Sequence, residues 1–160
     1  MTTQILILIL LILTNGLFSL AEMAVVSARK ARLQQRAEEG SQGAKTALAL
    51  AVHPTRFLST VQIGITLIGI LSGTLGGATL AENLSAFLAQ SPVLEPYSDA
   101  IGVGIVVTII TYFSLVIGEL VPKRLAFSNA ERIAVLVAPF MQFVATATSV
   151  CDTCTARKCR

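Results

Sequence analysis

The 160-residue chain has few charged side chains: 13% of its residues are Asp, Glu, Lys or Arg, whereas 54% are hydrophobic. Its mean hydropathy of +0.75 is far above that of an ordinary soluble domain. This composition excludes a water-soluble globular protein and indicates a membrane protein. Polar side chains are costly in lipid, so the few that interrupt the apolar segments are the informative ones.

Cysteine is confined to the last ten residues, and histidine occurs once, at His53 before a proline, where a capping or interfacial role is expected. Cys151, Cys154 and Cys159 lack a fourth ligand, so they predict neither a disulfide framework nor a zinc site. We interpret residues 151–160 as an atypical tail left by expression or sequencing.

No Ser/His/Asp or Cys/His arrangement and no phosphate-binding glycine loop occurs, so no enzyme is expected. The net charge of +3 is mild, and the basic residues cluster at the ends of apolar segments, which argues against a nucleic-acid partner.

Three apolar segments are long enough to cross a bilayer as helices, which takes roughly 20 residues. They cover residues 4–27, 57–80 and 100–122. The first lacks a basic flank and a cleavage pattern, so it is a retained helix rather than a signal peptide. A weaker apolar segment, residues 133–150, forms most of a juxtamembrane helix that is predicted over residues 131–150. The sequence therefore predicts an all-α membrane protein with three transmembrane helices per subunit, in a domain spanning residues 1–150.

The stretches that flank the apolar segments alternate in charge along the chain, from basic to acidic and back to basic. The loop over residues 28–52 is strongly basic and is predicted to form two short juxtamembrane helices. The next loop carries Glu82, Glu95 and Asp99 without any lysine or arginine, and basic residues return after the third segment. By the positive-inside rule, the N-terminus lies outside and the C-terminus lies in the cytoplasm. A fourth crossing would export the basic tail, so residues 133–150 are expected to stay on the cytoplasmic side, kinked at Pro139.

The first segment carries a polar stripe. Asn15, Ser19 and Glu22 follow one another at i, i+4 and i+7, so they lie within roughly 60° of one helix face. Helix packing, with Glu22 paired to a basic loop residue, accounts for such a stripe, and so does a functional site. The sequence leaves both interpretations open.

The second segment contains glycines at every fourth position. Gly69, Gly73 and Gly77 allow close helix approach, and Gln62 and Thr66 continue the same face. Packing is the simpler interpretation of the glycines. The close approach would also bring Gln62 and backbone carbonyls toward a shared central site.

The third segment ends in SLVIGELVPKR, where a carboxylate interrupts an apolar run. Pro122 lacks an N–H, so the carbonyl of Gly118 loses its usual helical donor and needs another donor or a cation. Glu119 stands next to that carbonyl, and together they offer the oxygen ligands that hard cations prefer. The alternative for Glu119 is an interfacial pair with Lys123, which a helix broken at Pro122 would disfavour.

The segments NGLFSLAEMAVVSARKARL, FLSTVQIGITLIGILSG and GELVPKRLA, in this order and spacing, resemble the transmembrane domain of the CorC/CNNM family of magnesium transporters over residues 5–150. The resemblance implies a homodimer in the inner (plasma) membrane, with a cytoplasmic helical belt, and export of Mg²⁺ coupled to Na⁺ entry. It also implies ATP-binding CBS domains in the full-length protein, which this chain lacks. By motif position it implies a magnesium site that includes Ser19, Glu22, Gly118 and Glu119, with Pro122 as the helix break. The facing of the helices adds Asn15, Gln62 and Gly64.

Two other functions fit the same sequence. One is a membrane anchor and dimerisation module that serves regulatory domains outside this chain. The other is a channel for divalent cations. Transport direction, coupling ion and stoichiometry do not follow from the residues.

Overall fold

The computed structural model describes residues 2–52, 54–90 and 95–156, with side chains described up to Ala145 apart from those of Arg56, Ala78 and Thr79. His53 and Cys159 lie outside the described residues. The side chains of Cys151 and Cys154 do so as well, and the predictions about all four stay predictions.

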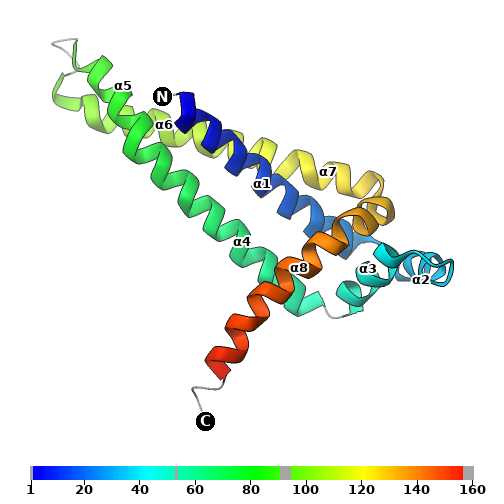
Figure 1. Ribbon diagram of the computed structural model, residues 1–160. Coiled ribbons are helices and arrows are strands. Elements are labelled where there is room, and N and C mark those ends of the chain that lie inside the picture. The colour runs from blue at the N-terminus through cyan, green and yellow to red at the C-terminus, as the bar shows by residue number, and fades with distance from the viewer. Residues whose placement is uncertain (1, 53, 91–94, 157–160) are drawn as a thin grey trace. The chain divides into compact units, whose positions relative to one another are not determined.

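Helices make up nearly all of the described chain (Figure 1). In order they are α1 (Thr2–Ser27), α2 (Lys30–Glu38), α3 (Gln42–Val52), α4 (Pro54–Leu75), the π-helix η1 (Gly76–Leu80), α5 (Ala81–Leu88), the 3₁₀ turn η2 (Glu95–Tyr97), α6 (Ser98–Leu115), the π-helix η3 (Val116–Leu120), α7 (Val121–Ser128) and α8 (Ala130–Ala156). The prediction of an all-α protein is confirmed.

Three stretches of these helices are long and apolar enough to cross a membrane. They are Thr2–Ser27, Phe57–Leu75 and Glu95–Ser128. Many of their large apolar side chains are exposed, as expected when lipid rather than water is the surrounding solvent. The prediction of three helical stretches with the length and apolar composition of membrane spans is confirmed.

The second apolar segment and the weaker segment within residues 131–150 differ from their predicted extents. Helical structure after α4 continues through η1 and α5 to Leu88, beyond the predicted end at residue 80. The fourth segment belongs to α8, which runs without interruption past Pro139. Within the described residues α8 is not among the candidate membrane spans. Its place on the cytoplasmic side stays a prediction.

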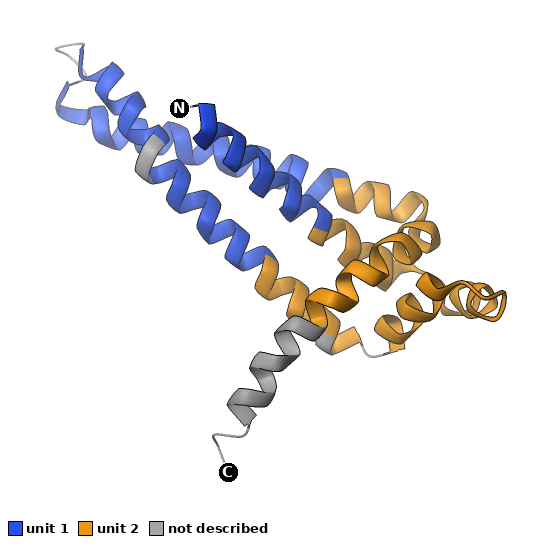
Figure 2. Ribbon diagram, in the orientation of Figure 1, with its two compact units in different colours: residues 1–17, 65–121 blue, residues 18–64, 122–160 orange. Residues whose placement is uncertain are grey.

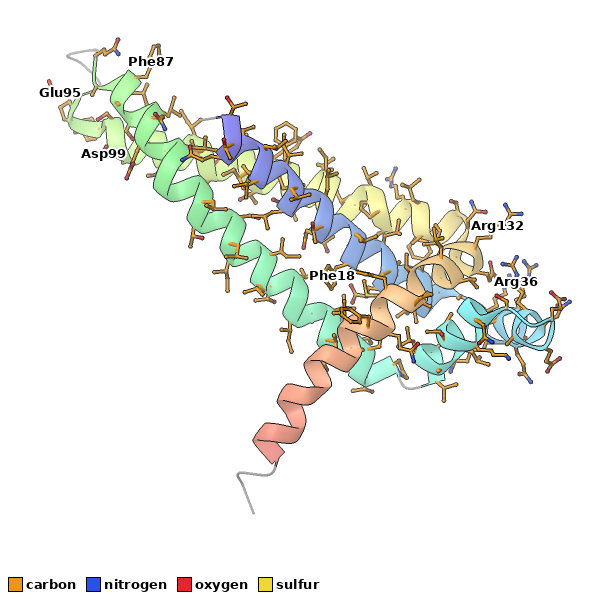
Figure 3. The ribbon with its side chains drawn as sticks, viewed as in Figure 1. Phe18, Arg36, Phe87, Glu95, Asp99 and Arg132 are labelled. Atoms are coloured by element: carbon orange, nitrogen blue, oxygen red, sulfur yellow. The ribbon has the colours of Figure 1, made fainter. Side chains whose placement is uncertain are left out.

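The chain divides into two compact units, coloured separately in Figure 2. Unit 1 comprises residues 1–17 and 65–121, and unit 2 comprises residues 18–64 and 122–160. All 12 Lys and Arg residues of the sequence belong to unit 2, whereas every charged residue of unit 1 is a carboxylate. The carboxylates of unit 1 are Glu82, Glu95, Asp99 and Glu119, and Figure 3 shows Glu95 and Asp99 together at one end of this unit. A protein that obeys the positive-inside rule separates its charges in this way.

Unit 1 is held by close packing of α5 and η1 against α6. Gly102 of α6 lies against the hydroxyl and backbone nitrogen of Ser85, and Gly76 of η1 lies against the side chain of Ile110. A Cβ atom at Gly102 would also crowd backbone atoms of Ser85 and Ala81, so Gly102 permits the close approach of α6 to α5, whereas at Gly76 the flexible end of Ile110 could shift.

Unit 2 has a core of small side chains where α3 packs on α8. The alanines Ala44, Ala47 and Ala51 of α3 are buried, as are Ala134, Val137, Ala138 and Met141 of α8. Alanine brings two helix backbones together and combines this with high helix propensity. Leu33 is fully buried and extends the core onto α2.

One close contact between α3 and α8 involves a proline-freed carbonyl. Pro139 has no N–H, so the carbonyl of Val135 lacks its usual i+4 donor within α8. Gly43 of α3 faces that carbonyl, and a Cβ atom on Gly43 would lie 2.5 Å from the Val135 oxygen and 2.9 Å from its Cγ1. The missing side chain at residue 43 thus permits the contact.

We expect Gly43→Ala to lower the stability of unit 2. Overpacking of this kind costs about 1–3 kcal/mol, which exceeds the roughly 1 kcal/mol that alanine gains in helix propensity. The measurement is the thermal unfolding midpoint in detergent. Gly104→Ala is the matched control, because a Cβ atom there meets nothing within 4 Å. Equal midpoints for the two variants would contradict the packing argument.

Candidate cation site

Unit 1 contains two π-helical turns: η1 directly follows the candidate span Phe57–Leu75, and η3 lies within the candidate span Glu95–Ser128. In η1 the N–H of Ala81 bonds to the carbonyl of Gly76, five residues back, and in η3 the N–H of Val121 bonds to the carbonyl of Val116 in the same way. Single π-turns within α-helices are rare and occur frequently at functional sites. The second of these turns contains Gly118 and Glu119.

The predicted helix break at Pro122 is a change of helix type, and the helix continues. The chain passes from α6 through η3 into α7, and Pro122 is the second residue of α7. The regular i to i+4 hydrogen bonding of this stretch is interrupted by η3, directly before Pro122, while the helical path continues into α7. The role of Pro122 as the helix break of a cation site stays a prediction.

The carbonyl of Gly118 bonds to a side chain of α1. The Nδ2 atom of Asn15 lies 3.3 Å from this oxygen and donates to it. Gly118 is buried, and a Cβ atom there would lie 2.9 Å from the same Nδ2. The sequence predicted that this carbonyl would meet another donor or a cation, and the structure supplies the donor. Asn15 and Gly118 are thereby brought together.

Two buried oxygen atoms of α1 lack hydrogen-bond partners in the described part of the chain. They are Oδ1 of Asn15 and Oγ of Ser19. The carbonyl of Gly118 only accepts hydrogen bonds, so the amide of Asn15 must turn its NH₂ group to it and leaves Oδ1 unused. Ser19 is only 1% exposed. An unsatisfied buried oxygen costs about 1–3 kcal/mol, so each oxygen needs an explanation.

Glu119 is half-buried and lies in η3 directly after Gly118. Glu119, like Lys123, interacts with another group of the protein. In unit 1 the structure thus brings together the amide of Asn15 and the carbonyl of Gly118, and Glu119 is the next residue of η3. The part of these three residues in a cation site stays a prediction.

The other predicted site residues belong to unit 2. They are Ser19, Glu22, Gln62, Gly64 and Pro122. Ser19 follows Asn15 by one turn on the same face of the unbroken helix α1. Gln62 is exposed and engages another group, and Glu22 is half-buried. Their part in a metal site stays a prediction.

Gly64 has a packing partner that the sequence did not reveal. A Cβ atom at Gly64 would lie 2.9 Å from Cε1 of Phe18, whose ring is buried. The other neighbour of this ring is Phe140 of α8, at 6.4 Å between centroids in an edge-to-face arrangement. Figure 3 shows Phe18 on α1. One more phenylalanine in an apolar helix carries no signal, so only the structure shows that it joins α1, α4 and α8.

The chemistry of the site is that of neutral oxygens around one carboxylate. Within the described residues no three His, Cys, Asp or Glu side chains gather closely enough to hold a metal ion. Oxygen ligands of this kind suit Mg²⁺, which often keeps some of its waters and binds through few carboxylates. A separate groove of about 640 Å³ in unit 1 has an almost wholly apolar lining, including Leu8, Ile9, Ile109 and Phe113, and offers no ligands to a cation.

The fold and the candidate site define a polytopic helical membrane domain with a few buried polar groups on its apolar helices. Residues 6–152 match the family model of the cyclin M (CNNM) transmembrane N-terminal domain. The chain belongs to this family, which confirms the resemblance drawn from its motifs.

Relatives among characterised and uncharacterised proteins agree with the assignment. The chain is 55% identical over 139 residues to the UPF0053 protein sll0260 of Synechocystis sp., covering 87% of this chain and 31% of that protein. It is 34% identical over 137 residues to the UPF0053 protein YrkA of Bacillus subtilis, covering 86% and 32%. It is 32% identical over 142 residues to the polyamine export protein of Haemophilus influenzae, covering 87% and 32%. The chain thus spans about a third of the length of these relatives.

We expect the contributions of Asn15 and Pro122 to stability to be coupled. In Pro122→Ala the restored N–H can bond to the carbonyl of Gly118, so Asn15→Leu should then cost less than it does in the native background. The expected coupling is about 1 kcal/mol, the net worth of one hydrogen bond. Unfolding in mixed micelles of the native protein, both single variants and the double variant measures it. Additive effects would contradict the role of Asn15 as the replacement donor.

Proposed function

We propose that this chain is the membrane part of a transporter that binds Mg²⁺ at Glu119 and its neighbours and moves it out of the cell. The family is one of cation transporters and is generally non-enzymatic. The observation that carries the proposal is the group around η3: the carboxylate of Glu119, the carbonyl of Gly118 and the unused Oδ1 of Asn15. Ser19 adds a second unused oxygen one helical turn along α1.

Dehydration is the difficult step in binding Mg²⁺. This ion releases water reluctantly, so a site must offer oxygens at about 2.1 Å in place of the lost shell. One carboxylate provides attraction, and neutral oxygens complete the shell without adding charge. A site with a single formal charge also lets the ion leave, which transport requires. Entry of Na⁺ is the proposed source of energy, and it follows from the family resemblance alone.

The proposed assembly is a homodimer in the plasma membrane, with the N-terminus outside. Gly69, Gly73 and Gly77 support close contact with a second subunit, because a Cβ atom at any of them meets nothing within 4 Å. The charge separation between the units supports the orientation, since all lysines and arginines belong to unit 2. The relatives' greater length supports further domains, for which we propose the CBS pair.

Two rival functions predict different fluxes. A membrane anchor and dimerisation module should carry no Mg²⁺ in proteoliposomes, with or without a gradient. A channel should conduct Mg²⁺ without any dependence on Na⁺. The unsatisfied oxygens favour transport over an anchor, because a domain that only packs gains nothing from leaving them unpaired.

A polyamine is a second candidate substrate, favoured by the name of the relative in Haemophilus influenzae. An alkylammonium group would bind Glu119 and neutral oxygens as a hydrogen-bond donor. Competition by putrescine in the Mg²⁺ flux assay separates the two substrates. Inhibition at concentrations below those of Mg²⁺ would favour the polyamine.

We expect Glu119→Gln to weaken Mg²⁺ binding by about tenfold or more, equivalent to about 1.4 kcal/mol, and to abolish flux. The substitution keeps the shape of the side chain and removes its charge. Titration calorimetry and dye-reported flux in proteoliposomes provide the measurements. Glu82→Gln is the matched control, because Glu82 is an exposed carboxylate of the same unit. Unchanged affinity and flux in Glu119→Gln would refute the site.

We expect Ser19→Ala to separate stability from binding. Removal of a buried hydroxyl without a partner should leave the unfolding midpoint unchanged or raise it, since such a group costs about 1–3 kcal/mol. Mg²⁺ affinity should fall, because one oxygen ligand is lost. The control is Ser72→Ala, which changes a different buried serine, on α4, and should leave the Mg²⁺ affinity unaltered. A lower midpoint with native affinity would show that Ser19 serves packing alone.

A further inference from the structure

Arginines gather in unit 2 where α2 meets the start of α8. Arg32 and Arg36 follow each other by one turn on one face of α2, and Arg29 is the extended N-cap residue directly before this helix. Nη1 of Arg32 lies 3.9 Å from Oε1 of Glu131, which joins this face to the first turn of α8. Arg132 follows directly, and Figure 3 shows Arg36 and Arg132 projecting at the same end of unit 2.

The positive charge of this cluster is only partly balanced. The guanidinium groups of Arg29, Arg36 and Arg132 make no hydrogen bond or ion pair with any described residue. Of the nearby carboxylates, Glu131 faces Arg32, while Glu38 and Glu39 accept hydrogen bonds from Gln34 and Gln35 at the end of α2. The cluster can therefore bind an anion.

The same region of α8 carries an exposed apolar ridge. Leu136 is 79% exposed, Phe140 45% and Phe143 74%. With Arg132 they lie within roughly 80° of one face of α8, the arginine at its N-terminal end. The opposite side of α8 is buried against α3. The ridge thus carries Arg132, a member of the arginine cluster, at its N-terminal end and bulky apolar groups along the rest.

We infer that this face, formed by the four arginines with Leu136, Phe140 and Phe143, binds an anionic phospholipid of the surrounding leaflet. The guanidinium groups fit the phosphate, because their planar forks bind phosphate oxygens in pairs. The ridge fits the acyl chains, as in amphipathic helices that lie in the membrane interface. A soluble phosphate or an acidic protein would leave the ridge unused. Lipid binding here does not depend on which ion the protein carries.

Native mass spectrometry of the whole chain in detergent tests the inference, with phosphatidylglycerol and phosphatidylcholine of identical acyl chains added in equal amounts. The native protein should retain phosphatidylglycerol preferentially. Arg36→Gln with Arg132→Gln should reduce its retention about fivefold or more. Lys30→Gln with Lys45→Gln is the matched control, because it removes the same charge from exposed positions of unit 2 outside the cluster and should retain the lipid.

A second pair of substitutions tests the ridge independently. Leu136→Gln with Phe143→Gln should also weaken retention of phosphatidylglycerol, and glycerol 3-phosphate should not displace the lipid from the native protein. Three results would each overturn the inference: equal retention of the two lipids, an equal loss in the lysine control, or displacement by glycerol 3-phosphate. Unfolding midpoints confirm that the compared variants are folded.

Discussion

A backbone carbonyl inside a bilayer must find its donor within the protein, and this requirement organises unit 1. Pro122 removes the usual donor of the Gly118 carbonyl, and the NH₂ group of Asn15 replaces it. The replacement fixes the register of α1 against η3, because only one turn of α1 offers an amide there. The π-turn η3 lies directly before Pro122, and the helical path continues from it into α7.

Unit 2 meets a similar requirement in another way. Pro139 frees the carbonyl of Val135, and α3 approaches that oxygen through the bare Cα of Gly43. A contact between this Cα and the Val135 oxygen is far weaker than the hydrogen bond that Asn15 donates to the Gly118 carbonyl. Its value lies in letting two alanine-rich helices come close enough to bury their small side chains. A carbonyl freed by a proline thus marks a helix contact in each unit, with a strong donor at Gly118 in unit 1 and close packing at Val135 in unit 2.

The sequence predicted the spans because length and hydropathy belong to each segment by itself. It also showed that Gly118 would need a new partner, since that follows from Pro122 alone. The identity of the partner depended on the register of two helices distant in sequence. The π-turns stayed hidden, because one extra residue in a turn barely alters an apolar pattern. Phe18 was missed because one more phenylalanine in an apolar helix carries no signal. Gly64, proposed as a ligand, faces the ring of Phe18.

The hydrogen bond between Asn15 and the Gly118 carbonyl leaves one oxygen of Asn15 without a partner, and this oxygen bears on function. An amide that donates to a carbonyl keeps its own oxygen on the opposite side, so satisfying the backbone creates an unsatisfied Oδ1 on Asn15. Leucine would avoid that oxygen and would lose the donor. The same helix face continues into the unpartnered hydroxyl of Ser19. Structural needs explain the nitrogen of Asn15 and neither of the two oxygens. For Oδ1 of Asn15, a bound cation of the kind proposed for this site would offset the cost of burial without a partner, and release of that cation would restore the cost.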